Sequence, residues 1–131
     1  MKLLGEIRTG KNDFSFWMEK LLPYYIQKTG MIFFPGTLNV HLIECKYYFP
    51  LDCIRLEKEE YGGTVCVSMT PCTILAKNAY ILRTDSDRGK HGYSPEQILE
   101  IATDVKLRDE FKLRDGDLIE VEVNKGKMLK I

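Results

Sequence analysis

The sequence predicts a mainly β protein, a compact barrel of short strands that carries a few short helices. Apolar and polar residues alternate over several short segments of the 131-residue chain, as in strands with one buried face. Turn-forming residues separate these segments at short intervals, and two or three stretches show helical spacing or a helix start signal. Many short strands with a few small helices are typical of a barrel with helical caps.

The N-terminal part is expected to form a strand and then a helix. Residues 2–8 alternate as a strand does. Thr29-Gly30 supplies a helix stop, and Pro23 lies inside the helical pattern, so the helix either begins near Pro23 or kinks there. The apolar residues at helical spacing are Met18, Leu21, Leu22, Tyr25 and Ile26.

The middle of the chain is expected to be β. A strand is predicted at 37–42, and another near 53–57 runs to a hairpin turn at Tyr61-Gly62-Gly63 and returns through 64–67. A further strand pair flanks Lys77-Asn78, with residues 80–82 on its far side.

The C-terminal third begins with a polar loop at 83–92. Ser94-Pro95-Glu96 is a helix start signal, and the expected helix continues through residues 98–102. A short helix at 106–111 follows, and the turn at 115–117 leads into a strand at 118–123.

Composition indicates one soluble globular domain over residues 1–131. Nineteen basic and nineteen acidic residues balance, so neither nucleic acid nor an anionic membrane is an expected partner. No apolar run has transmembrane length and no signal peptide opens the chain, so we expect a cytoplasmic monomer. The cysteines have no C-x-x-C spacing and no zinc-finger spacing to a histidine, so they are expected to be small buried hydrophobes or spare thiols.

The most informative segment is residues 34–42, where the turn Pro35-Gly36 leads into a strand. Leu38, Val40 and Leu42 alternate toward a core, which places Thr37, Asn39 and His41 together on the opposite face. A hydroxyl and a carboxamide beside a glycine turn suit a hard cation or a phosphate group, with the ligand supplying the negative charge. The alternative is an edge strand with a solvated polar face.

A second segment, residues 5–12, comes close to a Walker phosphate loop, but Asn12 stands where that motif has the Ser or Thr that holds magnesium. The preceding strand is short, and the βαβ context of a P-loop domain is also missing. The segment is still basic and contains glycine, so it can contact a phosphate in another geometry.

Three blocks of the chain resemble the archaeal-type CTP-dependent riboflavin kinases in order and spacing. The opening Gly5-Glu6-Ile7-Arg8-Thr9-Gly10 is similar to the family's G-E-V-x-S-G, and Gly36-Thr37-Leu38-Asn39-Val40 to its G-T-L-N-[LV]. Near the C-terminus, residues 100–102 and 106–109 match E-I-I-A-P-x-K-L-R-E, and residues 113–117 match L-x-D-G-D.

The resemblance implies a six-stranded cradle-loop β-barrel that transfers the γ-phosphate of CTP to the 5′-hydroxyl of riboflavin, giving FMN and CDP. It implies Mg²⁺ held by Thr37 and Asn39, and riboflavin bound by Glu100. The family's flavin-contacting threonine falls on Gly92 in an ungapped count, with Thr84 and Ser94 as other candidates, and we take Ser94. No residue is assigned as the catalytic base, and Glu100 is the one candidate. The implied nucleotide-binding residues are Gly10, Lys11, Asn12, Asp13, Phe14, Ser15, Val105, Lys106, Leu107 and Arg108.

The chain departs from the family pattern at three places. The loop before Glu100 is longer than the family's, through residues 85–90. Thr9-Gly10-Lys11-Asn12-Asp13-Phe14 replaces the glycine-rich S-G-x-G-E-G, and Thr103 replaces the proline of I-A-P. Two alternatives follow. One is a non-catalytic flavin- or nucleotide-binding relative. The other is a DNA-binding barrel, because residues 113–121 are also similar to swapped-hairpin transcription factors.

Overall fold

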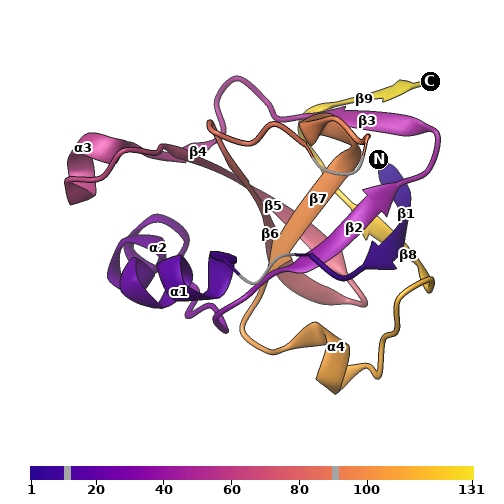
Figure 1. Ribbon diagram of the computed structural model, residues 1–131, viewed down its shortest axis with the longest axis horizontal. Helices are drawn as coiled ribbons and strands as arrows, with labels where there is room; N and C mark the ends of the chain where they lie inside the picture. The colour runs from indigo at the N-terminus through magenta and orange to yellow at the C-terminus, as the bar shows by residue number, and fades with distance from the viewer. Residues whose placement is uncertain (11–12, 90–91) are drawn as a thin grey trace.

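The computed structural model describes residues 1–10, 13–89 and 92–131 (Figure 1). Among these residues, six antiparallel strands close into a barrel, as predicted. Each strand pairs with the next, and the last pairs with the first. Their order around the barrel is β5 (Val67–Ile74), β6 (Lys77–Thr84), β7 (Ile98–Ala102), β2 (Leu38–Leu42), β1 (Lys2–Arg8) and β8 (Leu118–Glu122).

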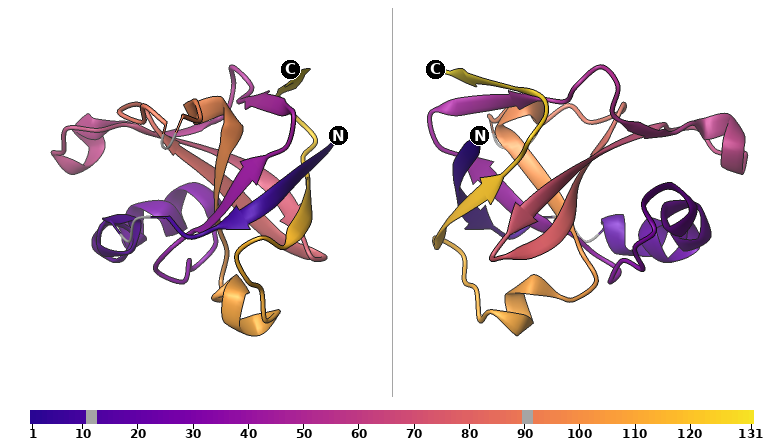
Figure 2. Two further views of the ribbon diagram at one scale, coloured as in Figure 1. Left: turned by 45° about the vertical axis from the view of Figure 1, so that its right-hand side comes forward. Right: turned by 180° about the vertical axis from the view of Figure 1, so that it is seen from behind.

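In the described part of the chain, three further strands lie outside the barrel. β4 (Ile54–Leu56) extends the sheet from β5, and β3 (Cys45–Tyr48) pairs with β9 (Lys127–Lys130) as a separate ribbon. This ribbon had no counterpart in the sequence prediction. β4 leads into the short helix α3 (Lys58–Tyr61), and both views in Figure 2 show this arm projecting from the barrel.

The predicted N-terminal helix is present as two helices, α1 (Asp13–Lys20) and α2 (Leu22–Thr29). Pro23 lies in the first turn of α2, where its missing N–H costs nothing, so a new helix begins beside it. Gly30 ends α2 in the left-handed conformation, with φ of 74° and its N–H bonded to the Ile26 carbonyl at 2.7 Å. The short helix α4 (Leu107–Glu110) connects β7 to β8 as expected.

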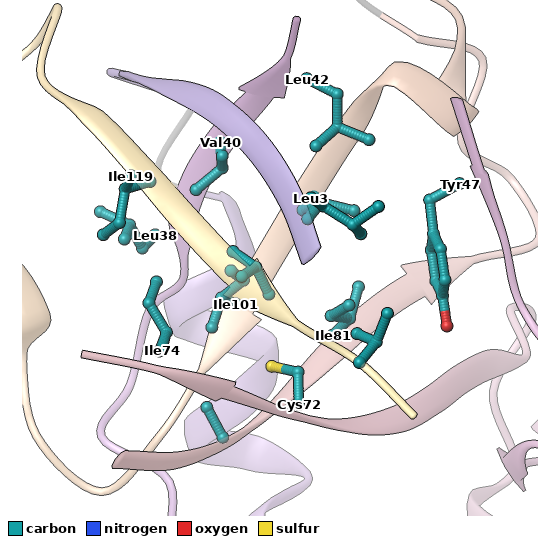
Figure 3. Packing of buried hydrophobic residues seen from close by; sticks show 14 of the residues in the cluster. Leu3, Leu38, Val40, Leu42, Tyr47, Cys72, Ile74, Ile81, Ile101 and Ile119 are labelled. Carbon is teal, nitrogen blue, oxygen red and sulfur yellow. The ribbon is translucent and has the colours of Figure 1, made fainter. Parts of the chain in front are cut away.

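Two hydrophobic clusters can be distinguished in the described part of the chain. The first fills the barrel, and Figure 3 shows Leu3, Val40, Ile81 and Ile101 among the side chains in it. The second lies between the helices and the outside of the barrel. It consists of Met18, Leu21, Tyr25, Phe33, Leu56, Val67, Met69, Leu82 and Ala102.

The predicted helix over 98–102 is wrong, because this segment is strand β7. Leu99 and Ile101 face the barrel core, while Ala102 packs under the helices, so apolar residues lie on both faces of the strand. A strand that is buried on both faces loses its alternation and cannot be told from a short helix by spacing. The start signal at Ser94 serves a single 3₁₀ turn at 95–97 instead.

Both predicted hairpin turns are displaced. Tyr61-Gly62-Gly63 ends α3, and the return strand starts at Val67, although β4 and β5 do pair as antiparallel strands. The second turn is Leu75-Ala76, with φ of 51° and 61°, so Lys77 begins β6. Neither residue is a type that favours positive φ, so the turn had no sequence signal. β6 also continues to Thr84, two residues into the predicted loop.

No helix within residues 1–10, 13–89 and 92–131 is both long and apolar enough to span a bilayer. The four cysteines are free, and Cys45 and Cys72 are buried. Burial raises the pKa of the Cys72 thiol to about 12, which keeps it protonated and unreactive near neutral pH.

The arm is tied to the end of β6 through Arg55. Its guanidinium donates to both carboxylate oxygens of Asp85 at 3.0 Å and to Ser68 Oγ at 2.7 Å. The hydrogen bond from Arg55 lowers the pKa of Asp85 below its ordinary value, so the interaction stabilises the folded state while Asp85 is ionised.

We expect Asp85→Asn to lower the free energy of unfolding at pH 7 by no more than about 1 kcal/mol, because the pair is half exposed. A carboxyl group whose pKa is depressed by folding stabilises the folded state at pH values above its pKa in the unfolded chain. This stabilisation is lost as the pH falls through its pKa in the folded protein. The difference in the free energy of unfolding between wild type and variant, measured with urea, should therefore disappear as the pH is lowered below about 4. A constant gap from pH 7 to pH 3 would contradict this assignment.

Candidate functional site

A pocket of about 420 Å³ lies where β1, β2 and β7 approach the N-terminal end of α1. Three segments of the described chain line it. These are residues 8–10 with 14–15, residues 34–39, and residues from 101 to 108. The first segment leaves β1, the second enters β2, and the third leaves β7. The pocket thus forms where three strand ends meet at one side of the barrel.

The polar face predicted for β2 lies in this pocket at Thr37 and Asn39. Asn39 is directly opposite Glu100 of β7 on one side and Arg8 of β1 on the other. The Thr37 hydroxyl donates to the Glu100 carboxylate at 3.1 Å. The Thr37 and Asn39 oxygens are therefore held close to a carboxylate, on the face opposite the barrel core.

Gly10 lies against Asn39. A Cβ placed on Gly10 would come within 2.3 Å of Asn39 Nδ2 and 2.7 Å of Oδ1. A Cβ at residue 10 would therefore crowd the carboxamide of Asn39, which is itself 7% exposed. Gly10 thus bounds one side of the space that the Asn39 amide occupies.

Cationic side chains among the described lining residues are each paired with an acid outside the lining. Arg8 bonds Glu6 at 3.0 Å, and Lys106 lies 3.8 Å from Asp109. Arg108 binds Asp115, whose pKa is held below its ordinary value, first by this guanidinium and then by the Thr9 hydroxyl. The pocket therefore combines guanidinium, ammonium and neutral oxygen groups, which suits a polyanion accompanied by a hard cation.

The structure gathers most of the predicted site residues. The nucleotide-binding candidates Gly10, Phe14, Ser15, Val105, Lys106, Leu107 and Arg108 line the same pocket as Thr37 and Asn39. Glu100 reaches it through its bond to Thr37. Lys11 and Asn12 lie outside the described residues, and Asp13 is described only as the first residue of α1.

Ser94 is not among the residues that line the pocket. Its N–H donates to Gln97 Oε1 at 2.9 Å, so the residue holds the 3₁₀ turn before β7. The binding of flavin by Ser94 therefore stays a prediction, placed outside this pocket.

Comparison with known proteins identifies the family. The family model for CTP-dependent riboflavin kinases, described as a domain of unknown function, DUF120, matches residues 9–123. This chain belongs to that family. It is also 31% identical to a riboflavin kinase of Archaeoglobus fulgidus, 29% to one of Thermofilum pendens and 29% to one of Pyrococcus abyssi.

These alignments cover 94%, 94% and 92% of this chain but 54%, 59% and 58% of the respective relatives. The chain therefore spans a little more than half the length of the riboflavin kinases that it matches.

Two departures from the riboflavin kinase pattern are accommodated by packing. Phe14 lines the pocket and also packs against the cluster under the helices, so it helps anchor α1. Thr103, in place of the proline, is 2% exposed, and its hydroxyl donates to the Asn78 carbonyl at 2.7 Å. Its own carbonyl accepts the Phe34 N–H at 2.8 Å, which fixes the start of the turn before Thr37.

Sequence reasoning missed Phe34 and Thr103 as pocket residues, and it included Arg8 only as part of the basic 5–12 segment. Phe34 is 41% exposed, and a large aromatic residue directly before the Pro35-Gly36 turn was the one available signal for it. Thr103 had no signal of this kind, because it lies just beyond β7 and reaches the pocket only in the folded chain.

Proposed function

We propose that this riboflavin kinase family member transfers the γ-phosphate of CTP to the 5′-hydroxyl of riboflavin, giving FMN and CDP. The observation that supports the proposal most directly is the single pocket that holds Gly10, Thr37, Asn39 and the 105–108 segment beside Glu100. Phosphoryl transfer needs little covalent chemistry from the protein, and it depends on positioning and on charge stabilisation.

The donor set at β2 fits Mg²⁺. Thr37 and Asn39 offer neutral oxygens, which this ion binds readily together with phosphate oxygens and water. Gly10 bounds one side of the space that the Asn39 amide occupies there. Bound there, the ion would offset the negative charge of the phosphates during transfer.

The remaining roles follow from the placement of the side chains. Arg108 and Lys106 would bind the nucleotide phosphates, with Val105 and Leu107 beside them in the same wall. Glu100 would hold the riboflavin end, where its carboxylate accepts the Thr37 hydroxyl and so lies next to the proposed metal ligand. The two substrates would then meet at Thr37, with the acceptor hydroxyl directed at the γ-phosphate.

The test is an incubation of the purified protein with riboflavin, Mg²⁺ and one of CTP, ATP, GTP or UTP, followed by chromatographic separation of FMN from riboflavin. We expect FMN with CTP as the preferred donor and none when Mg²⁺ is chelated. Formation of FMN with ATP and with no other nucleotide would support the kinase activity but reject CTP as the phosphate donor. A folded protein that forms no FMN with any donor would reject the kinase in favour of a binding protein.

A further inference from the structure

The turn at residues 115–117 is held by hydrogen bonds that do not involve the Asp115 side chain. The Gly116 N–H donates to the Ile7 carbonyl at 2.8 Å, and the Ile7 N–H donates to the Asp117 carbonyl at 2.9 Å. The Asp117 carboxylate accepts the Arg114 N–H at 2.8 Å. Gly116, with φ of 93°, supplies the left-handed residue. The turn is therefore explained by Gly116 and Asp117, which leaves Asp115 without a role in it.

The Asp115 carboxylate is directed toward the pocket wall instead. It accepts the Thr9 hydroxyl at 2.7 and 2.9 Å and the Nη2 group of Arg108. Arg108 Nη2 also lies 3.5 Å from the Thr9 hydroxyl, so the three side chains form one network. Thr9 and Arg108 line the pocket and Asp115 does not, so any effect of Asp115 on a ligand must pass through them.

We propose that Asp115 is a positioning residue, which holds the Arg108 guanidinium in place to bind the phosphates of the nucleotide. It ties Arg108 to Thr9, where the chain leaves β1 toward the proposed phosphate-binding residues. This inference rests on the nucleotide site of the proposed function and adds to it a residue that does not touch the ligand.

The geometry favours positioning over competition for the guanidinium. Arginine has five N–H donors on three nitrogens, and the contacts to Asp115 and Thr9 use Nη2. Nη1 and Nε can then serve a phosphate while the carboxylate fixes the plane of the group. The network is half exposed, and an exposed ion pair adds little to folding stability, so a stabilising role does not account for it.

The test measures binding of CDP and of inorganic tripolyphosphate by calorimetry in wild type, Asp115→Asn, Arg108→Ala and the double variant. We expect Asp115→Asn to weaken the binding of both ligands about tenfold, because the charge-assisted hydrogen bond that orients the Arg108 guanidinium is lost. In the Arg108→Ala background the same change should have no further effect, because Asp115 acts through Arg108. Riboflavin binding, followed by fluorescence quenching, should be unaltered.

The control is Asp52→Asn, which removes another exposed aspartate that is ion-paired, to Lys125, and should leave CDP binding unchanged. Equal or tighter CDP binding by Asp115→Asn would overturn the proposal in favour of competition. Additive losses in the double variant would overturn it in favour of a general structural effect, and a wild type that binds neither ligand would overturn it as well. Ligand binding without FMN formation would reject only the kinase activity.

Discussion

Asn39→Ala is expected to reduce kcat for FMN formation by at least about 100-fold, with the fold retained. Asn39 lies on the face of β2 opposite the barrel core and is held beneath Gly10, with Glu100 opposite it on β7. Loss of a metal ligand removes charge stabilisation of several kcal/mol from the transition state, and each 1.36 kcal/mol is about a factor of ten in rate. The measurement is the initial rate of FMN formation over a range of Mg²⁺ concentrations.

Asn78→Ala is the matched control, since Asn78 is an exposed asparagine on β6 and is not one of the pocket residues. We expect its turnover and urea midpoint to equal those of the wild type. High Mg²⁺ should restore little of the rate lost in Asn39→Ala, because the ligand itself is missing. Near-normal turnover in Asn39→Ala would show that Asn39 does not hold the metal and that its carboxamide only packs beneath Gly10.

Local sequence signals were sufficient for the elements that have one buried face or a clear cap. β1, β2 and β8 alternate, and Gly30 and the turn at 115–117 end or begin elements where expected. β7 was misjudged because its two faces are buried by different clusters, one inside the barrel and one under the helices. Nothing in residues 98–102 indicates that second cluster, which depends on where α1 and α2 pack.

The candidate site, like the fold, was predictable from the sequence only in part. Alternation along 37–42 placed Thr37 and Asn39 on one face, because Thr37 directly precedes β2 and the alternation continues through Asn39 within the strand. Their contacts with Gly10 and Glu100 join different strands, and only the tertiary structure brings them together. Asp115 was taken as part of a turn, since its bonds to Thr9 and Arg108 join segments that only the tertiary structure brings together.

The close approach of Gly10 and Asn39 gives a second prediction of large effect. We expect Gly10→Ala to lower FMN formation by about 100-fold, since a misplacement of about 1 Å at a reacting group can cost that much. The new Cβ would lie 2.3 Å from Asn39 Nδ2, so either the amide or the backbone at residues 9–10 must shift. Gly10 itself is not in the left-handed region, so the cost comes from crowding and not from backbone strain.

A double-mutant cycle separates this crowding from a general defect in the loop. Alone, Gly10→Ala should lower the free energy of unfolding by about 1–3 kcal/mol, as overpacking does. In the Asn39→Ala background the added methyl group meets no carboxamide, so most of that cost should disappear. Urea unfolding of the four proteins measures the coupling. Equal costs in both backgrounds, or wild-type turnover in Gly10→Ala, would mean that the 9–10 segment can move aside and does not hold Asn39 in position.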